Sequence, residues 1–226
     1  MNLKKVEYPT ALSNNVDRYN DNIDVFVETT DGTRYTLTVC TPQFYYSYMD
    51  KEGLNYVPSS PPDVIVKELT DEYINQALMS FCRNDGYLMK AYFFMGRNCC
   101  MHKENEMDRL WGMNNNIEKV QYQTALNEAD MYDDKIDILV EAEDGYEYKL
   151  TVCTPQFYYS YMDKEGLNYV PASPPDVIVK ELTDEYIMQA LQSFCENEGY
   201  WMKAYCLLGR CTAHTADEMD RILEYL

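Results

Sequence analysis

The sequence predicts an α+β fold, built from two tandem copies of a small β-β-α-β-α-β-α domain whose helices pack on a mostly antiparallel sheet. Two observations support this prediction. The chain of 226 residues contains a long internal repeat, and within each copy strand-like alternation is interleaved with helix-like segments. Each copy is about 110 residues long, a typical size for one small domain.

The repeat is strongest over one stretch, which we call the near-identical segment. Residues 37–74 and 150–187 agree at 37 of 38 positions, because only Ser59 differs from its counterpart Ala172. Outside this stretch the copies differ freely. Two explanations stay open: a recent duplication kept alike by local recombination, or the use of this segment by both copies for the same contact.

Weaker similarity on both sides of the near-identical segment sets the expected domain limits. The stretch GMNNNIE at residues 112–118 is typical of a short linker. We therefore expect a first domain over residues 1–113 and a second over residues 114–226.

The first copy is expected to begin with a β-hairpin. Residues 23–29 alternate between apolar and polar, and Asp31 with Gly32 is a turn signal. Residues 34–40 alternate again, so this second strand is expected to pair back on the first.

A short aromatic helix is expected next. Thr41 followed by Pro42 is typical of a helix start, and Gly53 marks the end, so the helix should cover residues 42–52. The proline-rich stretch at residues 57–62 is expected to be a loop.

The rest of each copy continues the α+β pattern. Residues 64–69 read as a strand, and Thr70 is expected to cap a helix over residues 71–82. A last strand over residues 87–94 and a closing helix over residues 103–111 complete the copy. The second copy repeats this order, and helices are expected to cover one face of each sheet.

The net charge of the chain limits the classes of partner that it is expected to bind. The chain has 19 Lys and Arg against 38 Asp and Glu, a net charge of −19. This balance argues against binding to nucleic acid or to an anionic membrane surface. The charge is uneven: residues 1–113 carry −5 (11 basic, 16 acidic) and residues 114–226 carry −14 (8 basic, 22 acidic).

The N-terminus has no apolar stretch typical of a signal peptide, and no apolar run is long enough to span a bilayer. We therefore expect a cytoplasmic protein whose eight cysteines stay reduced. Cysteine and histidine could form a zinc site, but buried free thiols explain them better, so we expect no metal or cofactor. The residues concerned are Cys99, Cys100, His102, Cys206, Cys211 and His214.

The step Val39-Cys40-Thr41-Pro42, followed by an aromatic helix, resembles small immunity proteins of bacterial polymorphic-toxin systems. The later strand and amphipathic helix also fit that group. The resemblance implies a non-catalytic protein that binds a cognate toxin, often a nuclease, and neutralises it by stoichiometric occlusion. The negative charge fits a basic toxin.

Two sets of residues are candidates for contact with this partner. Tyrosine, with 22 residues, is enriched at interfaces because it combines a large contact area with a polar tip, although core packing explains part of it. The acidic residues are either a steering surface or an ordinary solvated face. The candidates are Tyr45, Tyr46, Tyr48, Tyr56, Tyr158, Tyr159, Tyr161 and Tyr169, with Asp133, Asp134, Glu141, Glu143, Asp144 and Glu147.

Two other functions are weighed against toxin binding. The chain could be a non-catalytic tandem-repeat scaffold, whose copies bind two partners or one symmetric partner. It could also be a metal-dependent hydrolase that uses the Cys and His residues. We favour a non-enzymatic function, because the sequence has no nucleophile elbow, no phosphate-binding glycine loop and no His-rich metal motif.

Overall fold

In the part of the chain that the structure describes, there are two four-stranded sheets and four α-helices, so the α+β class is confirmed. In each sheet the first three strands are antiparallel and the fourth runs parallel to the third. The computed structural model describes residues 1–9, 12, 16–58, 63–83, 89, 116–143, 147–171, 176–196, 202 and 205.

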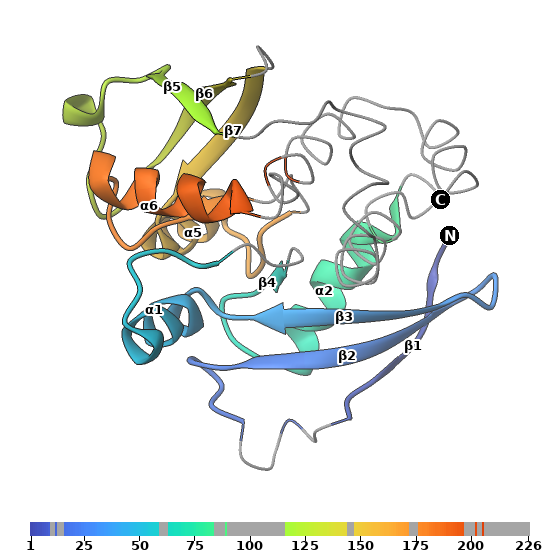
Figure 1. The fold of residues 1–226 in the computed structure, drawn as a ribbon. Helices are drawn as coiled ribbons and strands as arrows, with labels where there is room; N and C mark the ends of the chain where they lie inside the picture. Colours follow the sequence, from blue (N-terminus) through green and yellow to red (C-terminus); the bar gives the residue numbers. More distant parts are fainter. Residues whose placement is uncertain are drawn as a thin grey trace.

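The two sheets have the same strand order, β1-β2-β3-β4 and β5-β6-β7-β8 (Figure 1). The first half contains β1 (Leu3–Glu7), β2 (Asn22–Thr29), β3 (Arg34–Cys40), α1 (Pro42–Glu52), β4 (Val64–Ile65) and α2 (Asp71–Phe81). The second half contains β5 (Ile117–Tyr122), η1 (Leu126–Glu128), β6 (Lys135–Ala142), β7 (Glu147–Cys153), α5 (Pro155–Glu165), β8 (Val177–Ile178) and α6 (Asp184–Phe194).

Local sequence explains most of these elements. Val25 and Val27 on β2 are buried while Phe26 between them is exposed, as expected of a strand with one face in the core. The helix α1 ends at Gly53, whose φ of 68° is left-handed and favours glycine. The helix α2 begins after Thr70, whose hydroxyl accepts a hydrogen bond from the Tyr73 N–H at 3.2 Å.

The described residues form three apolar clusters. Each half has its own, formed by the buried face of its sheet and its second helix, α2 or α6. The third, which we call the shared cluster, takes residues from both halves where α1 and α5 contact each other (Figure 1). The buried members of the shared cluster are Cys40, Tyr45, Met49, Ile65, Cys153, Tyr158, Met162 and Ile178.

The structure corrects the sequence prediction in several places. The strands β1 and β5 were not expected, because LKKVE in β1 has only a weak alternation of apolar and polar residues. The strand expected over residues 64–69 ends at Ile65, because Val66 leaves the sheet and forms an isolated β-bridge with Tyr169 of the other half.

The end of each copy is described only in part. In the strand expected over residues 87–94 the structure describes Met89 alone, which is helical and buried, so the strand prediction is wrong at that residue. The helix expected over residues 103–111 lies outside the described residues. The expected linker at residues 112–118 is too long, because β5 begins at Ile117.

Candidate functional site

Two of the eight candidate tyrosines lie inside the molecule. Tyr45 and Tyr158 are each 3% exposed, and their ring centroids are 6.5 Å apart across the shared cluster. The Tyr45 hydroxyl donates to Asp63 Oδ2 at 3.0 Å, and the Tyr158 hydroxyl donates to Asp176 Oδ2 at 3.1 Å. These rings join the two halves and leave no surface for a partner.

A thiol completes each of these polar pairs. Cys40 Sγ lies 3.7 Å from Asp63 Oδ2, and Cys153 Sγ lies 3.7 Å from Asp176 Oδ2. Burial raises the pKa of both carboxyls to about 6, and burial beside the carboxyl raises the pKa of both thiols well above the ordinary value. A thiol with a raised pKa is a poor nucleophile, and both thiols pack among the buried members of the shared cluster.

The other six candidate tyrosines are partly buried near the contact between the halves. Tyr48 and Tyr161 pack beside Phe44 and Phe157 of their own helices, with ring centroids 6.1 and 6.0 Å apart. Tyr56 and Tyr169 form isolated bridges to the opposite half, and Tyr46 and Tyr159 are half-buried members of the shared cluster. Most of the eight candidate tyrosines therefore lie at the contact between the halves.

Tyr46 links this contact to the acidic candidates. Its hydroxyl, from the first half, has a pKa raised mainly by burial and further by the charges of Asp133 and Glu181 in the second half. Of the acidic candidates, Asp133 therefore acts on this tyrosine across the contact between the halves.

The strongest candidate for partner contact is a turn that we call the acidic loop, residues 130–134 (DMYDD). Met131 is 42% exposed and Tyr132 is 57% exposed, with acidic residues on both sides of them. Large exposed apolar side chains with a charged rim are typical of protein-binding surfaces. The sequence analysis named Asp133 and Asp134 as candidates but did not name these two apolar residues.

Backbone hydrogen bonds hold the acidic loop in shape. Asp130 Oδ1 accepts from the Tyr132 N–H at 2.9 Å, and Asp134 Oδ2 accepts from the Asp130 N–H at 3.3 Å. The Thr154 hydroxyl, at the start of α5, donates to the Tyr132 carbonyl at 2.8 Å. A loop fixed in this way loses little conformational freedom when a partner binds.

Two contacts tie the acidic loop to the rest of the second half. The Ser160 hydroxyl donates to Asp133 Oδ2 at 2.6 Å, and the Leu182 N–H donates to the Met131 carbonyl at 2.8 Å. The loop therefore sits on α5 and on the segment between β8 and α6.

The first half has an equivalent, which we call the first loop, residues 17–21 (DRYND). Its backbone makes the same hydrogen bonds, from Thr41 to the Tyr19 carbonyl at 2.9 Å and from Leu69 to the Arg18 carbonyl at 2.8 Å. Arg18 pairs with Glu68 at 2.6 Å and lies 5.7 Å from the Tyr19 ring. In the acidic loop Met131 replaces Arg18, so Glu181, the counterpart of Glu68, has no ion pair among the described residues.

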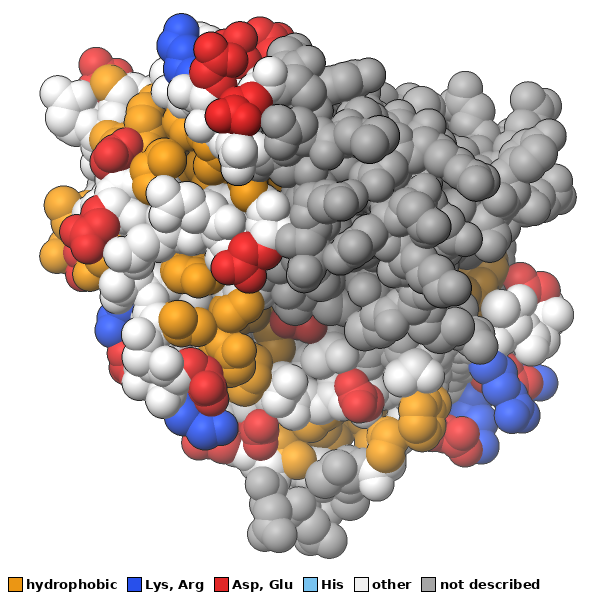
Figure 2. Space-filling model, in the orientation of Figure 1, with side chains coloured by type: hydrophobic (Ala, Val, Ile, Leu, Met, Phe, Trp, Pro, Cys, Tyr) orange, Lys and Arg blue, Asp and Glu red, His pale blue; other side chains and the backbone are white. Residues whose placement is uncertain are grey.

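The end of the second sheet is a further acidic region. Glu141 on β6 lies opposite Glu147 on β7, and Lys119 on β5 lies opposite Glu141 on the other side. Glu143 is exposed and accepts from Asn116 at 3.0 Å. Asp144 lies outside the described residues. Figure 2 shows acidic side chains gathered over this end of β5, β6 and β7.

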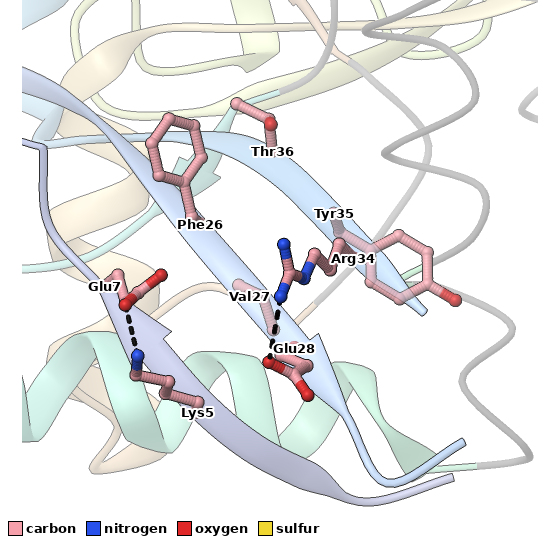
Figure 3. A pocket seen from close by; sticks show the side chains of 8 residues that line it. All are labelled: Lys5, Glu7, Phe26, Val27, Glu28, Arg34, Tyr35 and Thr36. Carbon is pink, nitrogen blue, oxygen red and sulfur yellow. Dashed lines mark hydrogen bonds and ion pairs between the residues drawn. The ribbon is translucent and has the colours of Figure 1, made fainter. Parts of the chain in front are cut away.

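The same place in the first sheet has its charges paired. Glu28 lies opposite Arg34, and it forms ion pairs with Lys4 and, at 3.9 Å, with Arg34. A shallow hollow of about 260 Å³ lies there, lined by Lys5, Glu7, Phe26, Val27, Glu28, Arg34, Tyr35 and Thr36 (Figure 3). Its charged groups are paired with each other, as the two dashed lines in Figure 3 show.

Among the described residues no group of three or more His, Cys, Asp or Glu could hold a metal ion. The candidate metal residues Cys99, Cys100, His102, Cys206, Cys211 and His214 lie outside the described residues. No helix in the described part of the chain has the length and apolar character that crossing a membrane requires.

Comparison of the chain with protein-family models, with curated proteins and with solved structures found no match. The resemblance to immunity proteins therefore stays a prediction from the sequence.

Proposed function

We propose that this chain is an immunity-type protein, which binds a basic bacterial protein toxin and neutralises it by covering the toxin's surface, without catalysing a reaction. The acidic loop supports this proposal most. Its hydrogen-bonded backbone presents Met131 and Tyr132 among carboxylates. The acidic loop has no counterpart of Arg18, the arginine of the first loop, because Met131 occupies that position.

The surface chemistry suits such a partner. Met131 and Tyr132 would serve as anchors that enter pockets on the toxin, because apolar and aromatic side chains dominate binding energy at interfaces. The carboxylates around them, and those at the end of the second sheet, would attract Lys and Arg on the toxin and speed association. The protein would act in the cytoplasm of the toxin-producing cell.

We also infer that the two halves arose by tandem duplication of one domain, with limits near residues 113 and 114. The equal strand orders of the two sheets support this inference. The near-identical segment supports it independently, at the level of sequence. One copy then kept its loop and sheet charges paired, while the other gained the acidic surface.

The test is capture of the partner from cells of the source organism, with three forms of the full chain as bait. The variant M131R+D133N converts the acidic loop to the sequence of the first loop, and R18M+N20D makes the reverse change. We expect the wild type and R18M+N20D to retain a basic polypeptide that M131R+D133N loses. The captured polypeptide should stop bacterial growth when expressed alone and lose this effect when the chain is expressed with it.

The same capture can refute the proposal. A partner retained equally by all three baits would remove the acidic loop from the interface. A captured polypeptide that is not toxic would remove the immunity function and favour the scaffold alternative.

A further inference from the structure

The contact between the two halves is reciprocal in its backbone. The Val57 N–H donates to the Ile178 carbonyl at 2.9 Å, and the equivalent Val170 N–H donates to the Ile65 carbonyl at 2.9 Å. A second pair of bonds repeats this relation. Lys67 N–H donates to the Asn168 carbonyl at 2.9 Å, and Lys180 N–H donates to the Asn55 carbonyl at 2.8 Å.

Side chains follow the same rule. Lys67 pairs with Asp163, and Lys180 pairs with Asp50. The amide of Asn55 donates to Gln189 Oε1 and that of Asn168 donates to Gln76 Oε1, both at 3.4 Å. The bridges Tyr56 to Val179 and Val66 to Tyr169 are also equivalent. Residue i of one half contacts residue j of the other, and j contacts i, which defines a two-fold, or isologous, interface.

These contacts coincide with the near-identical segment. All buried members of the shared cluster lie within residues 37–74 or 150–187, and so do the bonded residues named above, apart from Gln76 and Gln189. These two glutamines lie two positions beyond the end of the segment and are themselves the same residue type. The halves therefore agree in sequence where they contact each other.

Self-contact gives a physical reason for this agreement. An isologous interface uses the same surface twice, so each position contacts its partner position in the other copy and the reverse contact occurs as well. A change at one position in one copy therefore leaves its partner position in the other copy mismatched. Loops outside the contact, such as the first loop and the acidic loop, are free to differ.

We propose that the near-identical segment is a self-recognition surface, so that the two repeats bind each other as an isologous pair and the chain is a dimer fused into one polypeptide. Either repeat can then pair with any copy of this surface, including the same repeat of a second chain. The proposal is independent of toxin binding.

The test uses the full chain with a specific protease site inserted between residues 113 and 114. After cleavage at micromolar concentration, we expect both fragments to elute together at the position of the uncut chain. When cut protein with a tag on its first fragment is mixed with untagged cut protein, the tagged fragment should capture untagged first fragments as well as second fragments. Separation of the fragments after cleavage, or capture of second fragments alone, would overturn the proposal.

Charge variants of the cleavable chain identify the surface responsible. K67E+K180E turns both ion pairs into repulsive pairs, and we expect a dissociation constant about tenfold higher for the fragments. K51E+K164E makes the same charge change at exposed lysines outside the contact and should leave the constant unchanged. Adding D50K+D163K to K67E+K180E should restore association. Equal effects of the two lysine variants, or no recovery in the fourfold variant, would contradict the proposal.

Discussion

The first loop and the acidic loop share one backbone and differ in two side chains. Both are tied by a threonine hydroxyl to the start of a helix, at 2.9 and 2.8 Å. The first loop contains Arg18 and Asn20, whereas the acidic loop has Met131 and Asp133 at these positions. The difference shows that the fold fixes the geometry of the loop and leaves its chemistry free to change, so function can diverge between copies without loss of structure.

In contrast to the two loops, the shared cluster is built from the same residue types in both halves. Met49 and Met162 are both fully buried. Replacing either with Ala should lower the free energy of unfolding by about 2–5 kcal/mol, because each leaves a cavity in a packed core. Urea unfolding of M49A and M162A should give similar losses. A large loss for one variant and a small one for the other would break the equivalence.

The half-buried carboxyls of Asp63 and Asp176 should also respond alike to pH. The folded pKa of Asp63 and of Asp176 is raised to about 6, above the value near 3.8 for the free side chain. Ionisation therefore costs stability as pH rises from about 4 to 6, by roughly 3 kcal/mol per carboxyl. D63N and D176N should each gain stability relative to wild type over this range. Urea midpoints measured from pH 4 to pH 8 test this, and a gap that stays constant with pH would contradict it.

The ends of the two sheets should differ in a small and salt-dependent way. E147R places an arginine opposite Glu141, as Arg34 lies opposite Glu28. We expect a gain of about 0.2–1 kcal/mol in the free energy of unfolding, because a like-charged cross-strand pair becomes an attractive one. R34E should produce a loss of similar size. Both effects should shrink at 1 M salt, and effects that persist there would argue against an electrostatic origin.

Sequence predicted the parts of the fold that depend on local signals. The hairpin from β2 to β3 follows from alternation around Gly32, and α1 and α2 follow from Thr41-Pro42 and Thr70. The strand β1 was missed because its alternation is weak and its pairing partner β2 lies well along the chain. The pattern of residues within β1 alone does not indicate that it pairs with β2.

The candidate site was predicted only in part. The burial of Tyr45 against Tyr158 depends on contact between residues 113 positions apart, which the residues around each tyrosine do not reveal. Charge made Asp133 a candidate from the sequence, whereas Met131 and Tyr132 became candidates only through their exposure in the structure. Aligning DRYND with DMYDD would have pointed to Met131, because the alignment shows an arginine replaced by an apolar residue in an otherwise acidic turn.

We propose that the acidic loop, and not the first loop, contacts a basic partner. The most direct test of this claim is the affinity of the captured partner for the wild type, M131R+D133N and R18M+N20D at low and high salt. We expect M131R+D133N to bind about 10 to 100 times more weakly, with a smaller salt dependence, and R18M+N20D to bind as the wild type does. Equal affinities for all three proteins, or no change in affinity with salt, would contradict the claim.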